Sequence, residues 1–377
     1  MKTIGIIAEY NPFHRGHEAQ LRLLRERFGP DCTLVVALGG CFTQRGEAAL
    51  FTKYARAEAA VRCGADLVLE LPLPWAASSA EGFARGGVGV LDALGTVDVL
   101  AFGSECADPG KLARIAELTA SAEYDALLRQ ALASGAGYAG ARQKALEALA
   151  GEALPELAAR NDILGVEYLR ALRALGSAMT PLPLRRFGEF PPASALRGMA
   201  DFLPELPEGA AEVFRRETFL GRRAEPERLD AAILARLRSM TDGELAALPG
   251  ASEGLENRLK KAALAAGTVE ELVRLATTKR YPAARIRRMA LAAFLGIPAG
   301  LEKSLPPYLR VLGLNERGAR LLHDARPALP VVTKPADGRG EVFRLEARAC
   351  ALYALAFPDP AQRRGDMDYK ATPFVLK

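Results

Sequence analysis

Two histidines, three positions apart, have the clearest potential for chemistry in this sequence. The chain has only three histidines, His14, His17 and His323. The first two follow an apolar run at residues 3–8, and side chains three apart share one side of a helix. Imidazole N–H groups beside a helix N-terminus can donate hydrogen bonds to phosphate oxygens as negative charge grows on them. His14 and His17 are therefore the predicted catalytic pair for nucleotidyl transfer.

The residues around the pair fit a phosphate site at the start of a helix. Asn11 is expected to cap this helix and Pro12 to be its first residue, so that free backbone N–H groups face an anion. Gly16 leaves room for a ligand to approach the backbone. Two alternatives stay open at this point, a pair of ordinary surface histidines and a zinc site. No further histidine or paired cysteine is available to complete a zinc site.

Short apolar runs and helical stretches alternate through the first two hundred residues. Continuous apolar runs at 3–8, 33–38, 67–71 and 97–102 are typical of strands buried on both faces. Helical spacing between them, at 18–28, 53–62 and 81–94, predicts βαβ units and a parallel sheet. The fold class is therefore α/β, a Rossmann-like, doubly wound domain, with the phosphate site at the carboxyl end of the first strand.

The second half of the chain changes character. Ala, Leu, Arg and Glu recur at helical spacing from residue 205 onward, for example at 229–237, 254–266 and 269–277. Proline-rich stretches near residues 181 and 191 mark a junction. We expect a catalytic domain at 1–200 and a mainly helical domain at 201–377.

Composition narrows the class of protein. Half of the 377 residues are apolar and a quarter are charged, which is ordinary for a globular protein and excludes disorder as the main state. No apolar run reaches membrane length, so a cytoplasmic protein is expected. The five cysteines form no CxxC pair, and neither a structural metal nor a disulfide framework is expected.

Positive charge is concentrated in one segment of the helical half. Residues 258–288 hold nine basic and two acidic side chains, a net +7, whereas the whole chain carries +5. Such a patch attracts polyanions, although a solvated helical face is the usual explanation of a charge run. Tyr281 within the segment could stack on a base. The predicted RNA-binding side chains are Arg258, Lys260, Lys261, Lys279, Arg280, Arg285, Arg287 and Arg288.

Several sequence blocks together resemble one family. H-x-G-H after the first strand is similar to the motif of the nucleotidyltransferase superfamily, and more blocks resemble the bacterial tRNA(Met) cytidine acetate ligases. These blocks are residues 9–17 (EYNPFHRGH), 42–47 (FTQRGE), 66–72 (DLVLELP), 102–105 (FGSE), 161–168 (NDILGVEY) and 253–258 (EGLENR), with 278–281 (TKRY) and 285–288 (RIRR) in the helical half.

The resemblance implies a reaction and its participants. The family uses ATP to convert acetate into acetyl-adenylate and pyrophosphate, with Mg²⁺ expected on the leaving pyrophosphate. It then transfers the acetyl group to N4 of the wobble cytidine of elongator tRNA(Met). The implied ATP site comprises Ile7, Ala8, Glu9, Tyr10, Asn11, Pro12, Phe13, His14, Arg15, Gly16, His17, Glu18, Ala19 and Gln20, together with Gly103, Asn161 and Arg186.

Other implied positions depart from the family pattern or have simpler explanations. A second phosphate motif, Ser-Ala-Thr-x-Ile-Arg in the family, matches here only as Ser194 and Arg197. Without the resemblance, Gly103 is a turn glycine and Asn161 a helix cap. Gln44 and Arg45 could contact acetate or cytidine, or merely stabilise their loop. No general base is assigned among Glu9, Glu70 and Glu105.

Two other functions share some of these features. A small-molecule adenylyltransferase or cytidylyltransferase would also carry H-x-G-H, but it gives no reason for the basic helical segment. A non-catalytic RNA-binding protein would explain that segment but not the intact histidine motif.

Overall fold

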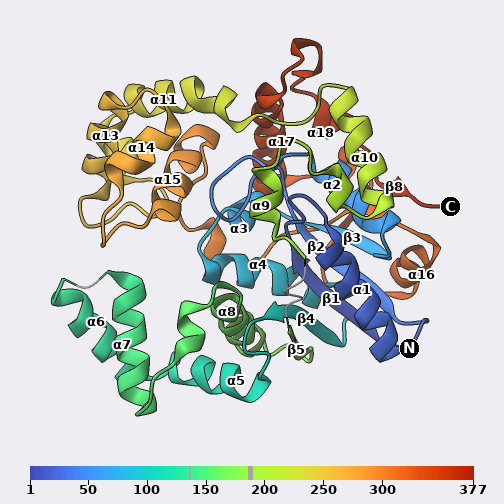
Figure 1. The fold of residues 1–377 in the computed structure, drawn as a ribbon, viewed down its shortest axis with the longest axis horizontal. Coiled ribbons are helices and arrows are strands. Elements are labelled where there is room, and N and C mark those ends of the chain that lie inside the picture. Colours follow the sequence, from blue (N-terminus) through green and yellow to red (C-terminus); the bar gives the residue numbers. More distant parts are fainter. Residues whose placement is uncertain (136, 186–189) are drawn as a thin grey trace.

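A mostly parallel sheet forms the centre of the molecule. The computed structural model describes residues 1–135, 137–185 and 190–377. Its strands occur in the order β5-β4-β1-β2-β3-β6-β7, with β8 paired to β6 (Figure 1). The strands are β1 (Thr3–Ala8), β2 (Thr33–Gly39), β3 (Leu67–Leu71), β4 (Val99–Ser104), β5 (Thr180–Arg185), β6 (Leu309–Leu314), β7 (Val331–Val332) and β8 (Phe374–Val375).

The parallel core confirms the predicted fold class. β1 lies between β2 and β4, with which it pairs in parallel, and chain order reverses at this point. Such a reversal is where open α/β sheets bind ligands. The predicted strands 3–8 and 67–71 match the structure, 33–38 gains one residue, and 97–102 is shifted by two.

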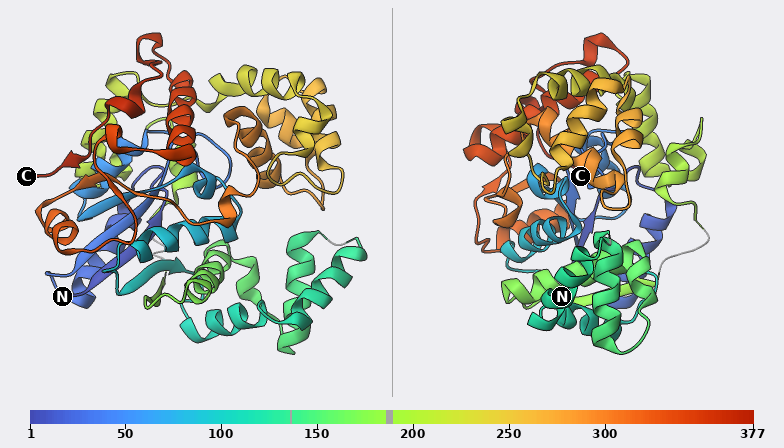
Figure 2. Two further views of the ribbon diagram at one scale, coloured as in Figure 1. Left: turned by 180° about the vertical axis from the view of Figure 1, so that it is seen from behind. Right: turned by 90° about the vertical axis from the view of Figure 1, so that its left-hand side faces the viewer.

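Helices cover both faces of the sheet. Most of the helices in the first half follow a strand or lead into one: α1 (Arg15–Phe28), α2 (Lys53–Arg62), α3 (Leu73–Ala76), α4 (Ala80–Ala93), α5 (Pro109–Leu118), α6 (Ala122–Ala133), α7 (Tyr138–Ala150) and α8 (Arg160–Leu175). Figure 2 shows α6 and α7 as a hairpin that extends away from the sheet, on the same side as the helical group of the second half.

The second half builds a helical lobe and then returns to the sheet. Its helices are α9 (Ala193–Arg197), α10 (Glu208–Phe219), α11 (Asp230–Ser239), α12 (Asp242–Ala246), α13 (Leu255–Ala265), α14 (Val269–Ala276), α15 (Ala283–Leu295), α16 (Glu316–Asp324), α17 (Gly340–Tyr353) and α18 (Met367–Lys370). The strands β6, β7 and β8 also come from this half, and β6 is antiparallel to β3. The half expected to be mainly helical therefore also completes the sheet.

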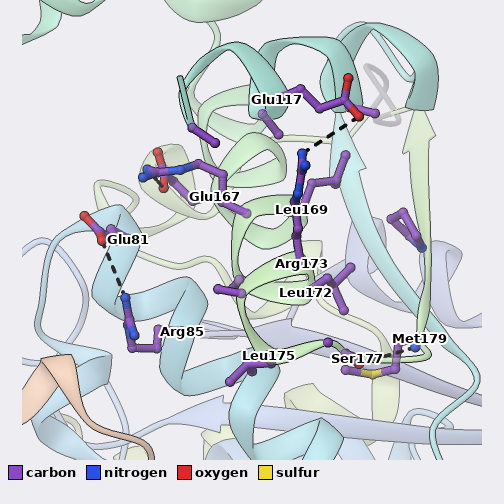
Figure 3. A pocket seen from close by; sticks show the side chains of 18 residues that line it. Glu81, Arg85, Glu117, Glu167, Leu169, Leu172, Arg173, Leu175, Ser177 and Met179 are labelled. Atoms are coloured by element: carbon purple, nitrogen blue, oxygen red, sulfur yellow. Dashed lines mark hydrogen bonds and ion pairs between the residues drawn. The ribbon is translucent and has the colours of Figure 1, made fainter. Parts of the chain in front are cut away.

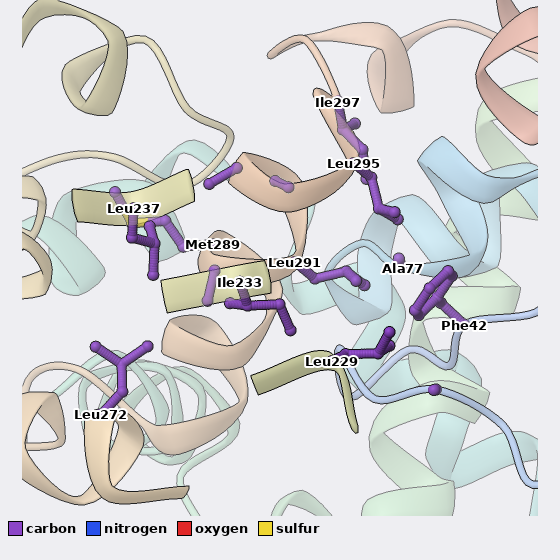
Figure 4. Packing of buried hydrophobic residues seen from close by; sticks show 14 of the residues in the cluster. Phe42, Ala77, Leu229, Ile233, Leu237, Leu272, Met289, Leu291, Leu295 and Ile297 are labelled. Carbon is purple, nitrogen blue, oxygen red and sulfur yellow. The ribbon is translucent and has the colours of Figure 1, made fainter. Parts of the chain in front are cut away.

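The helical lobe shares its core with the sheet domain. Leu237, Leu272 and Met289 pack inside α11–α15, and the same buried cluster continues to Phe42 and Ala77 of the first half (Figure 4). Because one apolar core spans both parts, the lobe is fixed against the loop that follows β2. This packing brings the basic segment close to the carboxyl ends of the strands.

A buried charge network attaches the C-terminal helices to the sheet. Lys53 of α2, fully buried, contacts Glu70 of β3, lies 3.0 Å from Glu346 of α17 and lies 2.8 Å from Asp368 of α18. Arg310 of β6 pairs with Asp368 at 2.7 Å. Since buried charges are costly unless paired, these contacts determine how α17 and α18 dock.

Candidate active site

The two predicted catalytic histidines cap the first helix reciprocally. His14 is the N-cap of α1, and its Nδ1 accepts from the backbone N–H of Gly16 at 3.1 Å. His17 Nδ1 in turn accepts from the backbone N–H of His14 at 3.3 Å. A neutral imidazole that accepts at Nδ1 carries its proton on Nε2. Both rings therefore have Nε2–H as their donor.

The predicted cap at Asn11 and first helical residue at Pro12 are wrong. The helix begins at Arg15, because His14 supplies the cap. Asn11 is buried, and its Oδ1 accepts from the backbone N–H of Leu50 at 2.8 Å. Its side chain thus anchors the loop between β1 and α1 to the segment that precedes α2.

A cleft of about 1000 Å³ opens at the carboxyl ends of β1, β4 and β5. Thirteen of the predicted ATP-binding residues line it: Ile7, Ala8, Glu9, Tyr10, Asn11, His14, Gly16, His17, Gln20, Gly103, Asn161, Ser194 and Arg197. They come from β1, the loop between β1 and α1, α1 itself, β4, α8 and α9. The fold thus brings together residues that lie almost two hundred positions apart in sequence.

Five other predicted ATP-site residues lie outside this lining. Pro12, Phe13, Arg15, Glu18 and Ala19 do not line the cleft. Phe13 is fully buried and packs its ring edge against Tyr10, with centroids 4.8 Å apart. Arg15 points away and donates to the carbonyl of Pro204 at 3.0 Å. Arg186 lies outside the described residues.

The described walls of the cleft are rich in arginine. Arg45, Arg160, Arg185, Arg197 and Arg287 line it, against the carboxylates Glu9, Glu47 and Glu105. Arg197 is fixed by donation from Nη1 to the carbonyl of Asn11 at 2.8 Å. This places the predicted second phosphate residue opposite the histidine loop. A concave site with excess positive charge suits a polyphosphate.

Glu9 is a half-buried carboxyl within this wall. Burial raises its pKa above the usual range, although Oε1 accepts from the backbone N–H of Gln44 at 2.6 Å and arginines lie nearby. Its position at the end of β1 links that strand to the loop after β2. Glu70, in contrast, lies in the buried charge network and does not line the cleft.

Asp162 supports the cleft wall without lining it, and the sequence analysis missed it. It is buried, and Oδ1 accepts from Ser104 Oγ at 2.5 Å and from the backbone N–H of Glu105 at 2.9 Å. The neighbouring Asn161 donates from Nδ2 to Glu105 Oε1 at 2.7 Å. The first turn of α8 therefore holds the turn that follows Gly103. The sequence could have indicated Asp162 only through its position directly after the predicted Asn161.

Most of the predicted RNA-binding arginines contact the protein itself. Arg258 donates to the carbonyls of Leu275 and Ala276, Arg285 donates to Gly250, and Arg280 pairs with Glu253 at 2.8 Å. Lys260 pairs with Asp242 at 2.6 Å. Within the described part of the chain, Lys261 and Lys279 are exposed and have no ion pair.

Tyr281 and Arg287, in the same segment of residues 258–288, also have partners within the protein. Tyr281 is buried and donates from its hydroxyl to the carbonyl of Glu253 at 2.5 Å, so its ring is not exposed for stacking on a base in this conformation. Arg287 lines the cleft itself and pairs with Glu47 at 3.4 Å. The helical lobe therefore contributes to the wall of the phosphate site.

A second cavity, of about 700 Å³, lies between α4, α5 and α8. Ion pairs at its rim join Glu81 to Arg85 and Glu117 to Arg173, and its floor includes Leu169 and Leu172 (Figure 3). None of the predicted site residues lines it.

Across the described ranges, no group of three or more His, Cys, Asp or Glu side chains is arranged to hold a metal ion. Nor is any described helix long and apolar enough to cross a membrane.

Comparison with known proteins identifies the family. The model of the HIGH nucleotidyl transferases matches residues 1–368. The tRNA(Met) cytidine acetate ligase of Syntrophotalea carbinolica is 40% identical over 100% of this chain and 99% of its own, and that of Acetivibrio thermocellus is 34% identical over 100% of both. The chain belongs to the tRNA(Met) cytidine acetate ligase family.

Solved structures of this ligase family agree with the fold. Thermotoga maritima TmcAL bound with alpha-thio ATP has a TM-score of 0.94 and 34% identity, with 100% of both chains covered. The apo form of the same protein has a TM-score of 0.93. The family and the nucleotidyltransferase fold expected from the sequence are confirmed, and with the family its enzyme class, a ligase.

Proposed function

We propose that this protein activates acetate with ATP and transfers the acetyl group to N4 of the wobble cytidine of elongator tRNA(Met). The observation that carries the proposal is the convergence of His14, His17, Gly103, Asn161 and Arg197 on one cleft. Its membership of the ligase family supports the choice of acetate and tRNA as substrates. The relative crystallised with an ATP analogue supports ATP as the nucleotide.

In the first step, a carboxylate oxygen of acetate attacks the α-phosphorus of ATP. The new O–P bond forms as the bond to the β-phosphate oxygen breaks, giving acetyl-adenylate and pyrophosphate. His14 and His17 donate from Nε2–H to the oxygens on which charge develops. Arg197 holds the departing phosphates, and the start of α1 contributes its positive dipole end. Acetate is a weak nucleophile beside an anion, so orientation and positive charge matter more than proton removal.

In the second step, N4 of the cytidine attacks the acetyl carbonyl carbon. The bond to the adenylate oxygen breaks, AMP leaves, and N4 loses a proton. Lys261 and Lys279 of the helical lobe are exposed and have no ion pair among the described residues, which makes them the cations most available to tRNA phosphates. The remaining predicted RNA-binding side chains stay candidates for the same surface. A tRNA substrate places the reaction in the cytoplasm.

In this scheme, Mg²⁺ would be bound to the ATP phosphates and would enter the cleft with them. The cleft carboxylates do not form a ligand set, since Glu9 accepts from Gln44, Glu47 pairs with Arg287, and Glu105 accepts from Asn161. The described residues therefore do not fit a resident metal, and no step is assigned to one.

Pyrophosphate exchange into ATP tests the proposal. The exchange should depend on acetate and proceed without tRNA, and subsequent incubation with tRNA(Met) should yield N4-acetylcytidine. Exchange that requires a cofactor precursor instead of acetate would indicate a small-molecule nucleotidyltransferase. No exchange with any carboxylate, alongside tight RNA binding, would indicate a non-catalytic protein.

A further inference from the structure

The turn that follows β2 lies between the phosphate cleft and the helical lobe. It is closed by backbone hydrogen bonds from Gly46 N–H to the carbonyl of Thr43 at 2.9 Å and from Thr43 N–H to the carbonyl of Glu47 at 2.8 Å. Its side chains Thr43, Gln44, Arg45 and Glu47 all line the cleft. The conformation of this turn therefore decides where the exposed Arg45 side chain lies in the site.

On the cleft side, the turn is attached through Gln44. Its backbone N–H donates to Glu9 Oε1 at 2.6 Å, and its Nε2 donates to the carbonyl of Ser78 at 3.2 Å. The turn is thereby held to the end of β1 and to the start of α4. These contacts fix one of its two faces.

On the opposite face, α15 holds the turn. Arg288 donates from Nη1 to the carbonyl of Gln44 at 3.3 Å, and Arg287 pairs with Glu47 at 3.4 Å. Gly46 has φ +81°, and a Cβ there would lie 2.6 Å from the backbone nitrogen of Arg288. Only a glycine can approach the helix this closely, so the turn and α15 fit each other along their backbones.

The environment of Arg288 does not suit a contact with RNA. Its side chain is partly buried, does not line the cleft, and donates inward to the turn. Burial, together with the neighbouring Arg285, lowers its pKa to about 10, so it remains a cation at neutral pH. Its charge therefore acts on the turn, whereas Arg287 reaches the cleft directly.

We propose that Arg288 is a positioning residue for acetate activation: it holds the turn at residues 43–47, and with it Arg45, in the cleft. This inference rests on the proposed acetate-activating function and deepens it. It reassigns one member of the basic run from tRNA binding to adenylate formation. The reassignment predicts that Arg288 matters in a reaction from which tRNA is absent.

Acetate-dependent pyrophosphate exchange without tRNA tests this directly. Arg288→Gln should lower kcat/KM for acetate about ten- to a hundredfold, the range expected when a reacting group is displaced by about 1 Å. Arg288→Lys, which keeps one donor, should recover part of the loss. Arg274→Gln is the matched control, because Arg274 belongs to the same basic run but is exposed on α14 and, among the described residues, pairs only with Glu271. It should behave as the wild type.

Two further measurements separate the possible outcomes. The salt dependence of tRNA binding should keep its slope in Arg288→Gln, whereas loss of a phosphate contact would reduce it by about 0.7–0.9. Wild-type exchange combined with a reduced slope overturns the inference. If Arg288→Gln does not fold, Gly46→Ala disturbs the same contact between the turn and α15 from the side of the turn. An exchange rate equal to that of the wild type in Gly46→Ala would also overturn the inference. Absence of acetate-dependent exchange in the wild type would instead refute the proposed function.

Discussion

The rings of His14 and His17 stack at the start of α1, with centroids 3.7 Å apart and planes 26° from parallel. Each Nδ1 accepts a backbone N–H of the first helical turn. In each ring, Nδ1 therefore caps the helix, and Nε2–H is the donor on the opposite edge.

Substitutions that retain the cap can separate these two tasks. Asn is a good N-cap, and Gln at the third helical position completes a capping box, so His14→Asn and His17→Gln should keep α1 intact. Both replace the imidazole Nε2–H by an amide N–H on a side chain of different shape, and each should lower acetate-dependent exchange about a hundredfold or more. Thermal unfolding should stay near the wild-type temperature. An equal loss of tRNA affinity in a binding titration would contradict this separation.

Four strands of the parallel core, β1 to β4, could be predicted because they are mostly buried and apolar on both faces. The fifth, β5, contains Pro181 and Pro183, so the prediction of a junction at this stretch was wrong. β6 escaped prediction for a physical reason: its apolar run is interrupted by Arg310, a buried cation that is neutralised by Asp368 some sixty residues later. β7 and β8 have two residues each and are too short for any periodicity to be visible. Their assignment depends on pairing with β6, which is a long-range contact.

The part of the site whose residues are close together in the sequence could be predicted. H-x-G-H lies within four residues, and its place after a strand is visible in the sequence. The cap was misassigned because histidine is not a common N-cap, and the His14–His17 pairing appears only once the loop is folded. The different tasks of Arg287 and Arg288 could not be inferred either, since the contact to Gln44 spans 244 residues.

The exposed lysines of the helical lobe offer a test of RNA binding. Lys261→Gln and Lys279→Gln should each weaken tRNA binding and reduce its salt slope by about 0.7–0.9, the release expected for one phosphate contact. The measurement is a titration of tRNA at several salt concentrations. Lys370→Gln is a suitable control, since Lys370 is an exposed lysine on α18 that pairs with Asp366 and lies outside the basic segment. Slopes that are unchanged in both variants would show that tRNA binds another face.

Asp162 provides a test of the turn after β4. Asp162→Asn replaces an oxygen that accepts backbone N–H groups by a donor, so the turn carrying Gly103 should shift. We expect KM for ATP to rise about tenfold or more, with little change in KM for acetate. Asp108→Asn is the matched control, because Asp108 caps α5 through Gly110 and Lys111 and does not line the cleft. A similar rise in both KM values, or in the control, would count against a role in nucleotide positioning.

The buried carboxyl of Glu346 predicts how stability depends on pH. Burial raises its pKa from 4.5 to about 7, and the nearby carboxylates Glu70 and Asp368 act in the same direction against Lys53. Between pH 4.5 and 7, the folded chain therefore retains a proton that the unfolded chain releases. This group stabilises the fold fully below pH 4.5, and its contribution is lost as the pH rises through 7.

Glu346→Gln removes this titration. The unfolding temperature of the wild type minus that of the variant should fall from pH 4.5 to 7 and become constant above pH 7. The Lys53 and Leu73 contacts of the side chain are also altered, so the informative quantity is the slope with pH and not the offset. Glu341→Gln, an exposed position on the same helix, should show no such slope. A difference that stays constant across this range would place the buried proton on another group of the network.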